Sequence, residues 1–183
     1  MKNKYYLKKE KKRANILSEI DELSNIDKVI SSNYVRAIST AKYIANKNNK
    51  DIDIIDDFGE RKFGVDSCDE LSSNFWMLQL NDENYKMPKG ECQKEVRERM
   101  INALNNILTK YKDKRIVIVS HGTAIVYLFK TWCDIKLNSD NAYSMYFNNK
   151  PMFNGKNFNA PELFKLEFND SDLINIENIN IEF

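Results

Sequence analysis

The only histidine of this 183-residue chain, His121, lies two residues after four consecutive β-branched residues at positions 116–119. Such a run is typical of a strand that is buried on both faces, and the apolar residues 124–129 predict a helix directly after it. His121 is therefore expected at the carboxyl end of a central strand and beside the N-terminus of a helix. Ligands bind at this end of α/β sheets, and helix N-termini favour anions. A histidine there can donate a hydrogen bond to an anion, and it carries positive charge when protonated.

A second segment has the same arrangement. The strand predicted over Lys28–Ser31 ends in hydroxyl residues, and a helix is predicted over residues 34–46 with Arg36 in its first turn. A cation is unfavourable at the positive end of a helix, so an arginine at this position is better explained if it faces a bound anion. The hydroxyl group of Ser31 would add a donor. An Arg36 side chain that simply extends into solvent is the alternative.

The order and spacing of three stretches resemble the histidine phosphatase superfamily, the phosphoglycerate mutase-like proteins. These stretches are residues 31–41, 58–64 and 119–122. Residues 88–92 resemble that family's proline-glycine-glutamate-serine segment, with Cys92 where serine is usual. The resemblance implies that His121 stabilises a phosphoryl group and that Glu60 occupies the position of the family's proton donor. A carboxyl group in that role protonates the leaving alkoxide.

The N-terminal segment departs from the family pattern. Family members begin with a strand followed by an Arg-His-Gly triplet, whose histidine is the nucleophile that becomes phosphorylated. Here a strand predicted over residues 4–7 leads directly into a helix predicted over residues 9–23, and the triplet is absent. Without that histidine, catalysis through phosphohistidine has no route, and losing half of a preorganised site costs orders of magnitude in rate. We therefore expect a phosphate-binding pocket with weak or no phosphomonoesterase activity.

Two other functions remain open: an active phosphatase with a non-standard nucleophile, and a non-catalytic protein that binds a phosphorylated ligand or a protein partner. A hydrolase pair of Ser120 and His121 is not expected, because adjacent residues of a strand point to opposite faces. We expect no metal and no other cofactor, since one histidine and scattered cysteines give no ligand spacing. The expected partner is a phosphorylated small molecule or inorganic phosphate.

Alternating strands and helices predict an α/β three-layer sandwich formed by residues 1–183 as a single domain. Its mostly parallel central sheet has helices on both faces, and antiparallel strands follow near the C-terminus. The other predicted elements are a strand over residues 52–55, a helix over 91–112, and strands over 143–147, 162–168 and 173–181. Turns are expected at Asn154-Gly155 and Asn169-Asp170. Residues 66–90 are expected to form an insertion that either acts as a lid over the strand ends or packs on the surface.

Composition limits the range of partners. The formal net charge is +1, so bulk charge indicates neither nucleic acid nor a membrane as a partner. The N-terminus has no apolar signal-peptide core, and the apolar runs are too short to span a bilayer. Three irregularly spaced cysteines fit a reducing compartment, so a cytoplasmic location is expected. No feature of the sequence indicates an oligomeric state.

Overall fold

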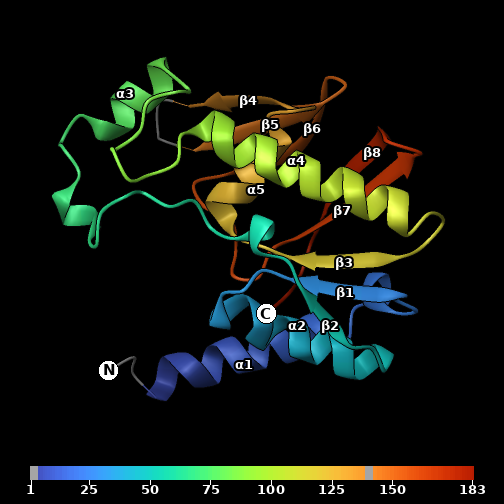
Figure 1. The fold of residues 1–183 in the computed structure, drawn as a ribbon. Helices are drawn as coiled ribbons and strands as arrows, with labels where there is room; N and C mark the ends of the chain where they lie inside the picture. Colours follow the sequence, from blue (N-terminus) through green and yellow to red (C-terminus); the bar gives the residue numbers. More distant parts are fainter. Residues whose placement is uncertain (1–3, 139–141) are drawn as a thin grey trace.

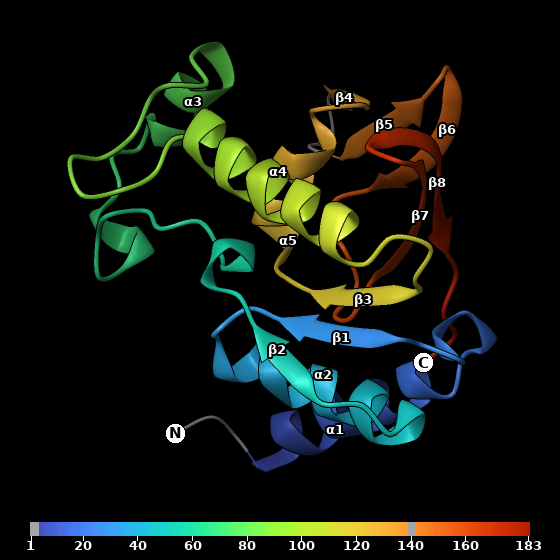
Figure 2. The same ribbon diagram turned by 45° about the vertical axis from the view of Figure 1, so that its right-hand side comes forward.

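The structure is a computed structural model that describes residues 4–138 and 142–183 (Figure 1). It is an α/β three-layer sandwich, as predicted. A parallel sheet lies in the middle, α1 and α2 cover one face, and α4 and α5 cover the other (Figures 1 and 2). The bounds of the elements up to the end of α5 are α1 (Lys4–Ser18), β1 (Lys28–Ser31), α2 (Val35–Asn48), β2 (Ile52–Ile54), α3 (Phe75–Asn81), α4 (Gln93–Lys110), β3 (Ile116–Val119) and α5 (Gly122–Phe129), with short 3₁₀ turns at Asp21–Leu23, Asp56–Phe58 and Cys68–Glu70.

Alternation along β1 and β3 creates the two apolar layers. Val29 packs with the helices α1 and α2, and the valines of β3 pack on the same side. Ile30 instead joins the larger core of α4 and α5, against which the isoleucines of β3 also pack. Successive side chains of a strand point to opposite faces, so one short apolar run supplies both layers.

The central strand of the parallel sheet is β1, which corrects the prediction that residues 116–119 form the centre. The strand order is β2-β1-β3, and within residues 4–138 and 142–183 β3 pairs only with β1. Val29 and Ile30 are fully buried, whereas all four residues of β3 are only partly buried. An edge strand between two helical layers still buries apolar side chains on both faces, so the β-branched run did not distinguish the edge from the centre.

The strand predicted over residues 4–7 is wrong, because these residues form the beginning of α1. No helix breaker separates them from the lysine-rich residues that follow, so one helix continues from Lys4 to Ser18. The predicted helix also ends earlier than expected, and a 3₁₀ turn covers Asp21–Leu23.

The C-terminal third is antiparallel, as predicted, and the part of it that the structure describes forms two sheets. One has the order β4-β5-β6, and the other is the β7–β8 hairpin. The predicted turn at Asn154-Gly155 is wrong, because these residues end β6; the turn lies at Asn148 and Asn149, whose φ angles are +49° and +62°. Asparagine tolerates this conformation, which a two-residue hairpin turn requires. The bounds are β4 (Asp134–Leu137), β5 (Tyr143–Phe147), β6 (Lys150–Gly155), β7 (Leu163–Asn169) and β8 (Asp172–Ile179).

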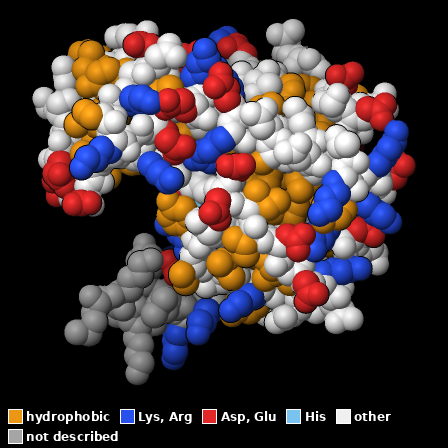
Figure 3. Space-filling view, in the orientation of Figure 1, with side chains coloured by type: hydrophobic (Ala, Val, Ile, Leu, Met, Phe, Trp, Pro, Cys, Tyr) orange, Lys and Arg blue, Asp and Glu red, His pale blue; other side chains and the backbone are white. Residues whose placement is uncertain are grey.

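Residues 66–90 extend from the side of the sandwich and carry α3 (Figure 2). Phe75 anchors α3 in the core, whereas Trp76 and Met77 are exposed. No helix within the described residues is long and apolar enough to cross a membrane. Acidic and basic side chains are interspersed over the face shown in Figure 3.

Candidate functional site

Two helix N-termini meet where β1 and β3 end. The strands are parallel neighbours, and Ser31 pairs with Val119. Their carboxyl ends therefore lie side by side at the same end of the sheet. The first strand leads through Ser32 and Tyr34 into α2, and the second leads through His121 into α5. This topology brings Arg36 and His121 together although they are 85 positions apart.

His121 is held by a hydrogen bond at each ring nitrogen. Its Nδ1 atom lies 3.1 Å from Nε of Arg36, and its Nε2 atom lies 2.7 Å from Oγ of Ser32. Arginine only donates, so Nδ1 must be the acceptor and the ring proton lies on Nε2, from which it is donated to Ser32. Burial, together with the charges of Arg36 and Arg99, lowers the pKa of His121 to about 4. The imidazole is therefore neutral near pH 7.

Arg36 connects His121 to Glu60. Its Nη2 atom lies 3.9 Å from Oε2 of Glu60, and its guanidinium group lies 4.7 Å from the centre of the Tyr34 ring. The same ring meets His121 edge-on at 4.7 Å between centroids. About half of the Arg36 side chain remains exposed, so its outer N–H groups can still reach a ligand.

The Glu60 carboxylate lies at the start of α5. Its Oε1 atom accepts hydrogen bonds from the backbone N–H groups of Arg61 at 3.0 Å and Ala124 at 3.2 Å. The N-terminal end of a helix favours negative charge, which explains why an acidic side chain is stable there. Glu60, Arg36 and His121 thus form one connected group, although Glu60 comes from a loop, Arg36 from the first turn of α2 and His121 from the residue before α5.

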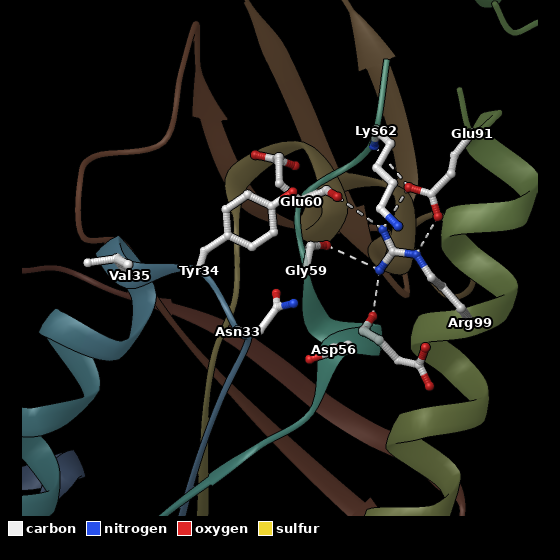
Figure 4. A pocket seen from close by; sticks show the side chains of 10 residues that line it. Asn33, Tyr34, Val35, Asp56, Gly59, Glu60, Lys62, Glu91 and Arg99 are labelled. Atoms are coloured by element: carbon white, nitrogen blue, oxygen red, sulfur yellow. Dashed lines mark hydrogen bonds and ion pairs between the residues drawn. The ribbon is translucent and has the colours of Figure 1, made fainter. Parts of the chain in front are cut away.

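A cavity of about 480 Å³ adjoins this group (Figure 4). Tyr34 and Glu60 line the cavity and also contact Arg36, whereas Arg36 and His121 are not among the lining residues. Its size is within the range of small-molecule sites. The lining residues are Asn33, Tyr34, Val35, Asp56, Asp57, Gly59, Glu60, Lys62, Glu91 and Arg99.

The far wall of the cavity is an ion pair. Nε of Arg99 lies 2.7 Å from Oε1 of Glu91. Burial alone raises the pKa of the Glu91 carboxyl, but hydrogen bonds from Arg99 and from the Lys62 amide together lower it below its ordinary value. Glu91 is therefore ionised, and it forms an ion pair with Arg99.

Ser31 does not face the same group as the other predicted site residues. It is fully buried, and its hydroxyl donates to the carbonyl oxygen of Ser32 at 2.9 Å. Ser32 contacts His121 instead. Adjacent residues of an extended chain point in opposite directions, so only one of the two serines can face His121. The sequence shows the pair, but it does not show which of the two side chains points toward the site. Tyr34, which touches both Arg36 and His121, was not singled out from the sequence.

The chain and its fold belong to one known class of proteins. Residues 9–149 match the family model of the histidine phosphatase superfamily (branch 1), and the chain belongs to this family, as its motifs predicted. Two curated relatives, from Erwinia tasmaniensis and Escherichia fergusonii, carry the name probable phosphoglycerate mutase GpmB. The first is 32% identical over 122 residues, covering 63% of this chain and 57% of the relative, and the second is 34% identical over 114 residues, covering 58% and 53%. The chain thus spans about half the length of the curated relatives it matches.

Solved structures share the fold at low sequence identity. A mycobacterial glucosyl-3-phosphoglycerate phosphatase in complex with inorganic phosphate has a TM-score of 0.58 at 16% identity, with 66% of this chain and 65% of that chain covered. A mutant phosphoserine phosphatase from Entamoeba histolytica in complex with phosphoserine has a TM-score of 0.57 at 20% identity, with 81% of each chain covered. These likenesses concern the fold.

Proposed function

We propose that the chain binds inorganic phosphate, or the phosphoryl group of a phosphorylated small molecule, between Arg36 and His121, and that it hydrolyses phosphomonoesters weakly or not at all. The observation that carries this proposal is the 3.1 Å contact of these two side chains where the N-termini of α2 and α5 meet. Family membership supports it, and two structural neighbours contain phosphate or phosphoserine.

Donors for an anion are concentrated at this place. The outer N–H groups of Arg36 provide a planar fork for two phosphate oxygens. The amides of Gly122 and Thr123 lie in the first turn of α5, where a helix offers them no internal acceptor. Together they supply charge and directed hydrogen bonds, which are the two requirements for holding a phosphoryl group.

His121 changes its state when phosphate binds, according to this proposal. In the free protein its Nδ1 lone pair accepts from Arg36 and its Nε2 proton is donated to Ser32. A phosphate anion beside the ring favours the protonated form, in which both nitrogens donate. Phosphate binding would then take up a proton.

The same arrangement supports weak or absent hydrolysis. A nucleophilic histidine needs a free nitrogen lone pair facing phosphorus, and the lone pair of His121 is directed at Arg36. His121 is also the only histidine among the 183 residues. Glu60 lies close enough to Arg36 to protonate a leaving group, but that step accelerates a reaction only after a nucleophile attacks.

The test is phosphate titration followed by calorimetry. We expect Arg36→Met and His121→Gln each to weaken phosphate binding about tenfold or more, because each removes a charge-assisted hydrogen bond. Lys42→Met is the matched control, since Lys42 is an exposed cation on the same helix α2. Equal affinity in the control and in Arg36→Met would contradict the binding site.

Turnover of a generic aryl phosphate by the same proteins tests the second half of the proposal. We expect no turnover above that of the two site variants. Clear turnover by the wild-type chain that disappears in Arg36→Met and His121→Gln would instead identify an active phosphatase with a non-standard nucleophile.

A further inference from the structure

Arg99 holds the loop that carries Glu60. Its Nη1 atom lies 2.5 Å from the carbonyl oxygen of Asp57 and 3.1 Å from that of Gly59, and its Nη2 atom lies 3.3 Å from the carbonyl oxygen of Glu60 (Figure 4). Three carbonyl groups of one short loop thus converge on a single guanidinium group of α4.

Glu91 completes this contact from the other side. It accepts from Nε of Arg99 at 2.7 Å and from Nη2 at 3.1 Å, which is a bidentate pair. Its Oε2 atom also accepts from the Lys62 amide at 2.9 Å, and its own amide donates to the Lys62 carbonyl at 2.8 Å. The loop is therefore held on both sides of Glu60.

Two glycines allow the loop that follows Glu60 to lie close to the segment that precedes Glu91. Gly64 has a φ of +80°, and a Cβ atom added to it would lie 2.3 Å from the Gly90 nitrogen. A Cβ atom added to Gly90 would lie 2.5 Å from the Phe63 carbonyl oxygen. Side chains at either position would separate the loop from the segment that carries Glu91.

Arg99 has no donor left for a ligand although it lines the cavity. Its five hydrogen bonds, two to the Glu91 carboxylate and three to loop carbonyls, match the five N–H groups of a guanidinium. Its guanidinium group is paired with the Glu91 carboxylate. An arginine bonded in this way fixes the groups around it and does not take part in anion binding itself.

We infer that Arg99 is a positioning residue: with Glu91, it holds the loop so that the Glu60 carboxylate stays beside Arg36 and at the start of α5. The inference rests on the proposed function only in treating Glu60 and Arg36 as parts of one site. Lysine cannot replace Arg99, because a single ammonium group cannot reach a carboxylate and three carbonyl groups together.

The test uses the Ala124 amide as a reporter of the position of Glu60. Glu60 Oε1 accepts a hydrogen bond from the Ala124 amide at 3.2 Å. The NMR chemical shift of this amide should therefore change when the Glu60 carboxylate is protonated. Glu60→Gln identifies that change by abolishing it. We expect Arg99→Met to abolish it as well, and Arg99→Lys and Glu91→Gln to reduce it.

Arg97→Met is the matched control. Arg97 lies on the same helix, is paired with Glu83 at 3.0 Å, and has a side chain that is 22% exposed against 19% for Arg99. The pH-dependent change in the chemical shift of Ala124 should persist in Arg97→Met, even if the melting temperature of this variant falls as far as that of Arg99→Met. If Arg99→Met and Arg99→Lys both keep the shift and differ from wild type only in melting temperature, Arg99 is merely structural and the inference is wrong.

Phosphate titration of the same proteins separates the two proposals. If the wild-type chain does not bind phosphate but Ala124 loses its shift in Arg99→Met, the proposed function fails and the positioning role stands. If Ala124 keeps its shift in both Arg99 variants, the positioning role fails, whatever the phosphate affinity.

Discussion

The Nε atom of Arg36 donates a hydrogen bond to the Nδ1 atom of His121 across 3.1 Å. The two groups that were expected to bind an anion therefore bind each other in the free protein. This contact requires a neutral imidazole, and burial among Ser32, Tyr34 and Arg36 favours that form. A phosphate anion must replace this contact or change the protonation of His121.

The contribution of His121 to the affinity for phosphate should increase as the pH falls from neutral toward 4. The pKa of His121 is about 4 in the free protein because of burial and the nearby charges of Arg36 and Arg99. A bound phosphate anion raises that pKa, so binding takes up a proton between the two values and does so no longer below the lower one. Calorimetry in buffers of different ionisation enthalpy measures the proton uptake, and the difference between wild type and His121→Gln isolates the part that belongs to His121. Proton uptake that is unchanged in His121→Gln would contradict this prediction.

Folding stability should show the opposite dependence at His121. The pKa of its side chain is about 4 in the folded protein, against an ordinary value of 6.5, so the unfolded chain binds the proton more readily. The contribution of this residue to the free energy of unfolding therefore falls as the pH drops from about 6.5 to about 4, by at most roughly 3 kcal/mol. Urea unfolding of wild type and His121→Gln at several pH values checks this, because the difference between the two isolates the His121 contribution.

The Tyr34 ring should matter for ligand binding, and its hydroxyl group should not. The ring lies against both the Arg36 guanidinium and His121. Cation–π contacts contribute on the order of 0.5–2 kcal/mol. We expect Tyr34→Ala to weaken phosphate binding about threefold to tenfold, and Tyr34→Phe to leave it unchanged. An equal loss in the two variants would mean that the hydroxyl group, not the ring, is the contact.

Arg61 should anchor residues 66–90 to the sandwich. It is only 3% exposed, and it donates to the Gln79 side chain in α3, to the Tyr127 hydroxyl at 2.8 Å and to the Glu91 carbonyl at 2.8 Å. We expect Arg61→Met to reduce the free energy of unfolding by about 2–4 kcal/mol, because buried acceptors lose their donor. Limited proteolysis should then cut the segment around α3 first. Cleavage elsewhere, with this segment still protected, would contradict the anchoring role.

A small gain in stability is expected from Cys92→Ser. Cys92 caps α4: its sulfur accepts from the Glu95 amide at 3.4 Å, and Glu95 accepts from the Cys92 amide at 2.9 Å. A serine hydroxyl is a stronger acceptor in the same capping box, so we expect a gain of about 0.5 kcal/mol. Thermal unfolding measures it, and Cys92→Ala, which removes the acceptor, should destabilise instead.

Local patterns in the sequence were sufficient to predict much of the fold and part of the site. The β-branched run before His121, the helix after it and the apolar face of α4 are all contained in segments of fewer than 20 residues. The place of Arg36 in the first turn of a predicted helix indicated an anion site, and the family motifs added Glu60. Such features depend on neighbours in the sequence, so they can be predicted without knowing the rest of the molecule.

By itself, the sequence determined the family, most of the strands and helices after residue 8, and that Arg36 and His121 each follow the end of a strand. Only the tertiary structure decided that β3 lies at the edge of its sheet, that Ser32 and not Ser31 reaches His121, and that Arg99 is bonded to the loop of Glu60. Strand order depends on pairing between distant segments, and the direction of a hydroxyl group depends on register. The bonding of Arg99 depends on carbonyl groups about 40 positions away. Periodicity along the chain contains none of this information, because each of these features is set by which distant groups satisfy one another when the chain packs.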